Sequence, residues 1–228
     1  MAENVNNSGQ RFEPYPLFAD LADEPVTVVG GGTVAERKVC TLLEHGARVT
    51  FVAPEATPVL ADLAAEGHIA WVRREYEPGD LADALLVVCA TDDTAVNESV
   101  YAEAQGRHQL VNVVDVPALC NFIVPSVLRR GRLQIAVSTG GASPSAAREI
   151  RRSLEREFPD YWEDYLDLMA ELRCIIKSRV VGPMERRAPL YEAVQSSDLL
   201  DRVAAGERPD AEQVYRTLVE PLLEGGAR

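Results

Sequence analysis

Residues 26–38 read VTVVGGGTVAERK, an apolar run that enters three glycines and leaves as a charged helix start. The spacing fits G-x-G-x-x-A, and a strand before it with a helix after it is the context in which this fingerprint binds a dinucleotide. Gly30 would permit the tight turn, Gly32 would let the backbone approach a pyrophosphate, and Ala35 would let the helix pack closely on the sheet. The free N–H groups at the helix start would hold the anion. The alternative is a strand-to-helix turn that needs glycine for geometry alone.

The first half of the chain alternates between strand and helix patterns. Short apolar or β-rich runs, expected as strands, are VTVVG, ARVTFVAP, HIAWVRREY, ALLVVCATDD and LVNVVDV. Segments with helical spacing lie between them, over residues 33–45, 57–67 and 95–107. Repeated strand–helix units of this length build right-handed crossovers, so we predict a Rossmann-type, doubly wound parallel sheet.

The pattern changes after Asp115. Two β-rich runs flank the turn-like RRGR segment, and a long helical pattern follows, with Ser143 as its N-cap, Pro144 at its first position and a break at Pro159. Two or three shorter helices are expected beyond it. We predict a disordered tail over residues 1–14, a dinucleotide-binding domain over 15–117, a small central β element over 118–150 and a helical C-terminal domain over 151–228.

The bulk composition excludes several classes of protein. The net charge of −13 argues against a nucleic-acid binder, because phosphate backbones require lysine and arginine. No apolar run approaches the roughly 20 residues that cross a bilayer, and the N-terminus lacks the features of a signal peptide. The four cysteines have no CxxC spacing and the three histidines form no ligand cluster, so we expect reduced thiols and no metal site. These features predict a cytoplasmic protein without nucleic-acid or membrane partners.

One segment departs from the acidic average. From Arg129 to Arg156 the chain holds seven arginines and two glutamates, a local balance of +5. Within it, a glycine turn, hydroxyl groups and a helix start suit an anion, because a helix start favours negative charge. The arginines add to this, because their forked guanidinium groups match carboxylates. The candidate substrate-binding residues are Ser138, Thr139, Gly140, Arg148, Arg151 and Arg152. The alternative is a solvated helix face whose arginines pair with its own glutamates.

The choice of cofactor is expected near the end of the second strand, about 20 residues beyond the glycines. Glu55 lies there, just after Pro54, and no arginine follows, so NAD is favoured over NADP. Thr91 and Asp92 end a later strand on the same edge of the sheet and are candidates to face the cofactor, although capping of the next helix also explains an aspartate there.

Asp115 ends the last strand of the set, two residues before Pro117. A carboxylate at the carboxyl edge of the sheet is well placed for acid–base chemistry. An aspartate before a proline is also a common turn residue. The residues alone leave both interpretations open.

Several motifs together resemble one family, precorrin-2 dehydrogenase, the sirohydrochlorin-forming module of sirohaem synthases. They are, in order, PLFADL, VTVVGGGTVAERK, LLEHGARVTFVAPE, VVCATDD, VNVVDVPALCNFIVPS and IAVSTGGASPSAAREIRRSLE. The resemblance covers residues 15–157 closely and the helical remainder loosely. It implies oxidation of precorrin-2, a tetrapyrrole with several carboxylates, to sirohydrochlorin with transfer of hydride to NAD, and in some members Fe²⁺ insertion to form sirohaem.

The resemblance also implies roles for individual residues. Asp115 corresponds to the family's functional aspartate, so a catalytic role is favoured for it. The cofactor loop maps onto Gly30, Gly32, Thr33, Val34 and Ala35, and the contact after the second strand onto Pro54 and Glu55. The family forms homodimers through the central β element and the helical module, which makes residues 118–150 a dimerisation and substrate element.

Two features differ from parts of the family. Some bifunctional members carry a phosphorylated serine before the glycine pair, where this chain has Thr139 beside Ser138, and at least one chelating relative uses a histidine in the helical module, whereas this chain has none after His108. The alternatives to the dehydrogenase are a Rossmann-fold NAD or redox sensor without catalysis, and a sirohydrochlorin chelatase that needs no NAD.

Overall fold

The computed structural model describes residues 13–225. The chain divides into two compact units, Met1–Val124 and Pro125–Arg228. The disordered tail predicted over residues 1–14 lies outside the described residues except for its last two.

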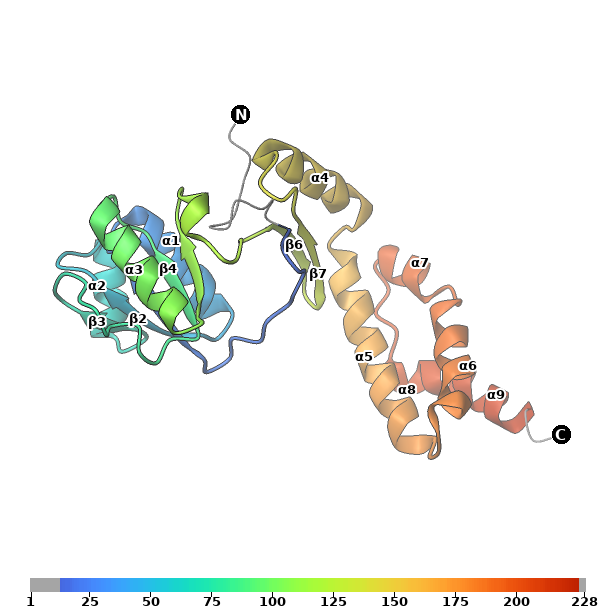
Figure 1. Ribbon diagram of the computed structural model, residues 1–228. Helices are drawn as coiled ribbons and strands as arrows, with labels where there is room; N and C mark the ends of the chain where they lie inside the picture. The colour runs from blue at the N-terminus through green and yellow to red at the C-terminus, as the bar shows by residue number, and fades with distance from the viewer. Residues whose placement is uncertain (1–12, 226–228) are drawn as a thin grey trace. The chain divides into compact units, whose positions relative to one another are not determined.

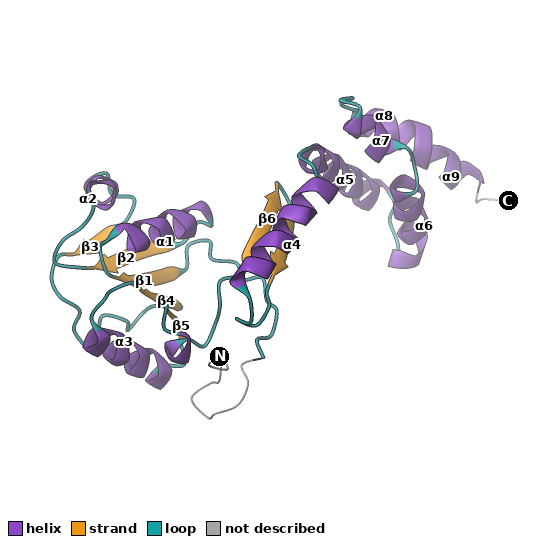
Figure 2. Ribbon diagram, turned by 90° about the horizontal axis from the view of Figure 1, so that it is seen from above, coloured by secondary structure: helices purple, strands orange, loops and turns teal. Residues whose placement is uncertain are grey.

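The first unit is a five-stranded parallel sheet in the order β3-β2-β1-β4-β5. Its strands are β1 (Pro25–Val29), β2 (Arg48–Val52), β3 (Ala70–Val72), β4 (Leu86–Cys89) and β5 (Leu110–Val113). Its helices are α1 (Thr33–Glu44), α2 (Pro58–Ala65) and α3 (Thr94–Gly106), followed by a short 3-10 helix, η1 (Pro117–Leu119). Figure 2 shows α1 and α2 on one face of the sheet and α3 on the other, so the predicted doubly wound fold is confirmed.

Two apolar cores cover the two faces of this sheet. Along β4, Leu86 and Val88 belong to the core under α1 and α2, whereas Val87 and Cys89 belong to the core under α3. The alternation follows from the two-residue period of a strand, and the apolar run LVVC satisfies both faces at once. Burial of one such valine contributes about 1.5–3 kcal/mol.

The strand order fixes where a ligand can bind in this unit. The chain leaves β1 toward β2 on one side, and β4 pairs with β1 on the other side. The loops after β1 and β4 therefore diverge at the carboxyl edge of the sheet, which opens a crevice at this switch point.

The second unit begins with an antiparallel hairpin of β6 (Ser126–Arg130) and β7 (Leu133–Val137), which turns at Gly131. The helices that follow are α4 (Pro144–Glu157), α5 (Tyr161–Arg179), α6 (Met184–Gln195), α7 (Leu199–Ala204), α8 (Ala211–Val214), a π-helical turn (Tyr215–Val219) and α9 (Glu220–Gly225) (Figure 1). The predicted hairpin is therefore confirmed, as are the N-cap at Ser143 and the break near Pro159.

No helix within the described residues is long and apolar enough to cross a membrane. The same part of the chain contains no cluster of three or more histidine, cysteine or acidic side chains that could hold a metal ion. Its four cysteines are free thiols.

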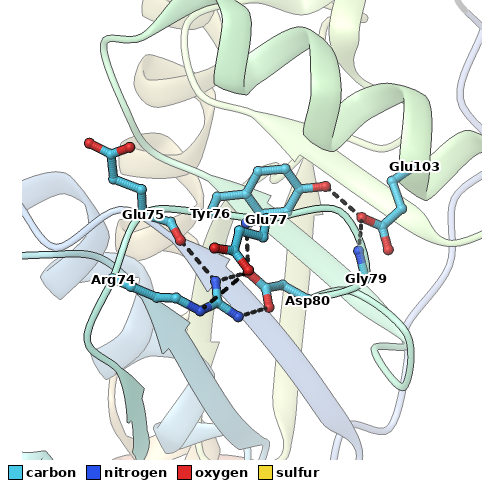
Figure 3. A network of polar contacts seen from close by, with 7 residues as sticks. All are labelled: Arg74, Glu75, Tyr76, Glu77, Gly79, Asp80 and Glu103. Atoms are coloured by element: carbon cyan, nitrogen blue, oxygen red, sulfur yellow. Dashed lines mark hydrogen bonds and ion pairs between the residues drawn. The ribbon is translucent and has the colours of Figure 1, made fainter.

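A polar network fastens the loop between β3 and β4 to α3 (Figure 3). Arg74 donates two hydrogen bonds to Asp80, at 2.7 and 2.6 Å. Glu103 of α3 accepts from the Tyr76 hydroxyl at 2.5 Å and from the Gly79 N–H at 2.9 Å. Charge-assisted hydrogen bonds therefore brace the loop internally, through Arg74 and Asp80, and attach it to α3, through Glu103.

The Glu103 carboxylate contributes pH-dependent stability. Its side chain is 12% exposed. Burial raises its pKa, but the hydrogen bonds from Tyr76, Gly79 and Arg107 outweigh burial and lower the pKa overall. Because the folded pKa lies below the unfolded value of about 4.3, this stability is present above that pH and is lost as the pH falls through the folded pKa.

We predict that Glu103→Gln lowers the free energy of unfolding of the first unit by about 1–3 kcal/mol at pH 7, because the hydrogen bonds lose their charge. The difference from the wild type should shrink below about pH 4. Urea unfolding followed by Trp71 fluorescence in a Trp162→Phe background measures this unit alone. The exposed Glu98→Gln on the same helix is the control, and an equal loss in both variants would contradict the account.

Candidate functional site

The turn between β1 and α1 requires glycine at two positions. Gly30 has φ +119°, and a Cβ there would lie 2.3 Å from the Ala90 carbonyl oxygen. A Cβ at Gly31 would lie 2.0 Å from the Glu55 carbonyl oxygen. The Gly31 carbonyl also accepts a hydrogen bond from the Thr57 N–H at 3.0 Å. The glycine turn is thus held against the loops that follow β2 and β4.

Gly32 has a different role from its two neighbours. It is the N-cap of α1, no side chain caps the helix there, and a Cβ would meet nothing within 4 Å. Thr33 and Val34, in the first turn, are exposed, while Ala35 is fully buried against the sheet. The first N–H groups of α1 therefore have no side-chain cap, and the space beside Gly32 is open. This is the arrangement that binds a phosphate.

Pro54 and Glu55 lie in the loop directly after β2, and both are exposed. The structure brings Glu55 to the glycine turn through its backbone, since its carbonyl oxygen faces Gly31. Its carboxylate remains available at the edge of the sheet, where the ribose of a dinucleotide binds.

A pocket of about 270 Å³ opens at the carboxyl ends of the central strands. Its lining residues come from α1, from the β4–α3 turn and from the end of β5: Val34, Ala90, Thr91, Asp92, Thr94, Asn97, Val114, Asp115 and Val116. The residues predicted from three separate segments, Val34, Thr91 with Asp92, and Asp115, therefore line one pocket.

The two aspartates after β4 have separate roles. Asp93 caps α3 by accepting from the N–H groups of Ala95 and Val96, at 2.8 and 3.1 Å. Asp92 is not the cap and lines the pocket instead. Capping therefore explains only one member of the pair.

Asp115 adopts a backbone conformation that is uncommon for a residue other than glycine. Its φ is +61°, in the left-handed region, and its side chain is exposed in the pocket. Such conformations cost free energy and concentrate at functional sites, although aspartate tolerates them better than most residues. Asp115 is therefore a turn residue, and its place in the pocket is also compatible with acid–base chemistry.

The pocket offers no thiolate nucleophile. Asn97 accepts a hydrogen bond from the Cys89 thiol at 3.0 Å, and burial raises the pKa of that thiol to about 12. Burial also raises the pKa of Cys120. At neutral pH both thiols are protonated, and neither lines the pocket, whose acidic side chains are Asp92 and Asp115.

The candidate substrate residues lie in the second unit. Ser138 accepts from the Gly140 N–H at 3.1 Å, and the Thr139 hydroxyl bonds the Ser143 backbone at 3.1 Å. These hydroxyls therefore shape the loop before α4. They lie beside the start of the helix that carries the arginines.

Only two of the three predicted arginines share a surface. Arg148 and Arg152 line an open hollow of about 470 Å³ together with Ser145, Ala146 and Glu149. Arg151 instead forms an ion pair with Glu155. The alternative of a self-paired helix face thus describes Arg151 and, through a 3.9 Å pair with Glu149, Arg152. Arg148 and Arg152 remain the candidate anion site because they line the hollow.

Comparisons with known proteins agree with this geometry. Residues 17–126 match a family model for NAD(P)-binding domains, and residues 130–157 match the model "Sirohaem biosynthesis protein central". "Siroheme synthase" of Methylobacillus flagellatus is 41% identical over 94% of this chain and 45% of that protein, and "Siroheme synthase 1" of Aeromonas salmonicida is 41% identical over 89% and 43%. A solved structure, "SirC, precorrin-2 dehydrogenase", superposes with a TM-score of 0.73 at 28% identity, over 88% of this chain and 100% of that one.

The chain belongs to the precorrin-2 dehydrogenase and sirohaem synthase family. It spans less than half the length of the curated sirohaem synthases that it matches. Its first unit is a nicotinamide-cofactor domain, and its residues fit that cofactor: the start of α1 is uncapped, as a pyrophosphate site requires, and the adjoining pocket is open.

The sequence reasoning missed two residues of this site. Gly31 occupies an unspecified position of the G-x-G-x-x-A pattern, yet it makes the closest backbone approach of the turn. Asn97 donates to the Thr91 carbonyl at 3.2 Å and is 6% exposed. A polar residue on the sheet-facing side of a helix was the signal that could have revealed it.

The glycine turn yields a matched pair of variants. We predict that Gly32→Ala lowers the free energy of unfolding by only about 1 kcal/mol or less, since alanine is a poorer N-cap than glycine, but weakens cofactor binding at least about tenfold, because the added methyl would occupy the pyrophosphate position. Gly31→Ala should lower stability by about 1–3 kcal/mol through its clash with the Glu55 backbone. Calorimetry and NADH fluorescence titration measure both effects, and wild-type affinity in Gly32→Ala would refute the assignment.

Proposed function

We propose that this chain catalyses the oxidation of precorrin-2 to sirohydrochlorin with NAD as the acceptor. The observation that carries the proposal is the position of Asp115, a strained and exposed carboxylate in the same pocket as the cofactor-loop residue Val34 and the strand-end residues Thr91 and Asp92. The similarity to a precorrin-2 dehydrogenase over nearly the whole chain supports the same reaction.

The reaction removes a hydride and a proton from the substrate. When bound, the nicotinamide supplies the hydride acceptor. The Asp115 carboxylate accepts the proton from the neighbouring substrate atom and then releases it to water. The balance is precorrin-2 and NAD⁺ to sirohydrochlorin, NADH and H⁺.

NAD is proposed over NADP because of the groups near the end of β2. The exposed carboxylate of Glu55 suits the hydroxyls of the ribose and would repel a phosphate. The nearest cation along the neighbouring strand, Arg73, stacks on Trp71 with its guanidinium 4.9 Å from the ring centre. A side chain engaged in this way is less available to a phosphate.

Arg148 and Arg152 are proposed to bind carboxylates of the tetrapyrrole. Arg148 makes no ion pair with any described residue, and Arg152 approaches Glu149 only at 3.9 Å. Arg148 can therefore exchange solvent for a substrate carboxylate, and Arg152 can do so by giving up an exposed pair with Glu149 that contributes little stability. Ser138, Thr139 and Gly140 shape the loop before these arginines, and Arg151 supports the helix through Glu155.

We further propose the division into residues 1–14, 15–117, 118–150 and 151–228, with the element 118–150 joining two copies of the chain in a cytoplasmic homodimer. No nucleic-acid or membrane partner is part of this proposal. Iron insertion is a second candidate activity: the names of the sirohaem synthase relatives suggest it, and the lack of a histidine after His108 in this sequence argues against it. The competing functions are an NAD sensor without turnover and a chelatase that needs no NAD.

One experiment separates these functions. The protein is incubated with precorrin-2 and either NAD or NADP, with and without Fe²⁺ or Co²⁺, and the absorbance of NADH, sirohydrochlorin and metal products is recorded. We predict NADH formation without metal, faster with NAD than with NADP. NAD binding without turnover would indicate the sensor, and metal insertion without NAD would indicate the chelatase.

Asp115→Asn should lower kcat about 10²-fold or more, because the proton acceptor is lost. Asparagine is chosen because it tolerates the left-handed backbone of this position, where alanine would be strained. The affinity for NADH and the melting temperature should stay at wild-type values. An unchanged kcat in Asp115→Asn would contradict a catalytic role for this residue.

Arg148→Gln with Arg152→Gln should raise KM for precorrin-2 about tenfold or more and leave the dissociation constant of NADH unchanged, since only substrate carboxylates lose their partners. Arg151→Gln is the matched control on the same helix. If all three substitutions raise KM equally, the assigned anion site is wrong.

A further inference from the structure

Asn97 is a buried polar side chain in the first turn of α3. It is 6% exposed, and among the described residues that line the pocket at the carboxyl edge of the sheet it alone is buried. A buried amide is unfavourable unless its polar groups have partners. The partners of Asn97 therefore indicate what its side chain does.

Two neighbours fix the orientation of the Asn97 amide. Its oxygen accepts from the Cys89 thiol at 3.0 Å, and its nitrogen donates to the Thr91 carbonyl at 3.2 Å. A carbonyl can only accept, and the thiol, whose pKa is raised by burial, is protonated at neutral pH and donates. Both contacts therefore require the same orientation, with the oxygen toward β4 and the nitrogen toward the turn that follows β4.

This orientation leaves one donor of the amide without a partner in the described part of the chain. An asparagine side chain carries two N–H groups, and the Thr91 carbonyl takes one of them. Because Asn97 lines the pocket, its second N–H can donate to an acceptor on a molecule bound there.

The charges of the pocket favour one kind of occupant. Its described lining includes the carboxylates of Asp92 and Asp115 and no lysine or arginine, so it suits a cation better than an anion. The oxidised nicotinamide ring is positively charged, and its neutral carboxamide presents an oxygen that accepts hydrogen bonds. Two carboxylates and one buried amide donor match this ring and its carboxamide.

We propose that Asn97 binds the nicotinamide end of the cofactor by donating its second side-chain N–H to the carboxamide oxygen. This inference rests on the proposed function, which brings the nicotinamide into this pocket. The carboxamide is attached to the ring that receives the hydride, so the bond from Asn97 orients that ring in the pocket.

The first test compares two ligands that differ only in the nicotinamide, NAD and ADP-ribose. Asn97→Leu keeps about the same side-chain volume but removes both donors. We expect it to raise the dissociation constant of NAD about fivefold or more and that of ADP-ribose less than about twofold. The exposed Glu98→Gln on the same helix is the matched control and should bind both ligands as the wild type does. Isothermal titration calorimetry measures all of these constants.

A second test uses the wild type alone, so it holds even if loss of the bond to Thr91 unfolds the variant. Thionicotinamide adenine dinucleotide carries sulfur in place of the carboxamide oxygen. It should bind about threefold or more weakly than NAD, because sulfur is the weaker acceptor. The 3-acetylpyridine analogue keeps the oxygen and lacks only the amino group, and its dissociation constant should stay within about twofold of that of NAD.

Equal weakening of NAD and ADP-ribose in Asn97→Leu would assign Asn97 to the turn alone and overturn the inference, as would wild-type affinity for NAD in this variant. Equal affinity of the wild type for NAD and the thionicotinamide analogue would also overturn it. If the expected differences are found but the wild type does not oxidise precorrin-2, the role of Asn97 stands and the proposed function fails.

Discussion

The turn between β1 and α1 brings backbones closer together than any side chain would allow. A methyl group at Gly30 or Gly31 would lie within 2.3 Å of the Ala90 carbonyl or 2.0 Å of the Glu55 carbonyl. This double approach fixes the start of α1 between the ends of β2 and β4, at the point where the strand order reverses. The uncapped helix end and the pocket beside it both follow from that constraint.

Charged side chains are distributed differently over the two units. The described side chains that line the pocket at the carboxyl edge of the first unit include two carboxylates, Asp92 and Asp115, and no cation, in a protein whose net charge is −13. On α4 of the second unit, Arg151 pairs with Glu155 and Arg152 pairs at 3.9 Å with Glu149, whereas Arg148 has no ion pair with a described residue.

Most of the fold could be predicted from the sequence because its signals are local. The two-residue period of the strands, the glycine turn and the Ser143–Pro144 cap each act within a few residues, and the structure confirms them. The site was predicted less completely. The fingerprint marks Gly30 and Gly32, but glycine is required at position 31 because of the backbone of Glu55, 24 positions later. The roles of Asp92 and Asp93 can be told apart only from the hydrogen bonds that cap α3. The contact at Gly31 is between distant segments, whereas the roles of Asp93 and Arg151 depend on local helix geometry that the residue types alone do not fix.

The central claim is that the carboxyl edge of the first unit holds the cofactor beside Asp115. A crystal structure of the protein with bound NAD tests it most directly. The account predicts the pyrophosphate at the N-terminus of α1 against Gly32, with the nicotinamide ring in the pocket lined by Val34 and Asp115. A cofactor whose nicotinamide lies away from Asp115, or whose pyrophosphate does not touch the start of α1, would contradict it.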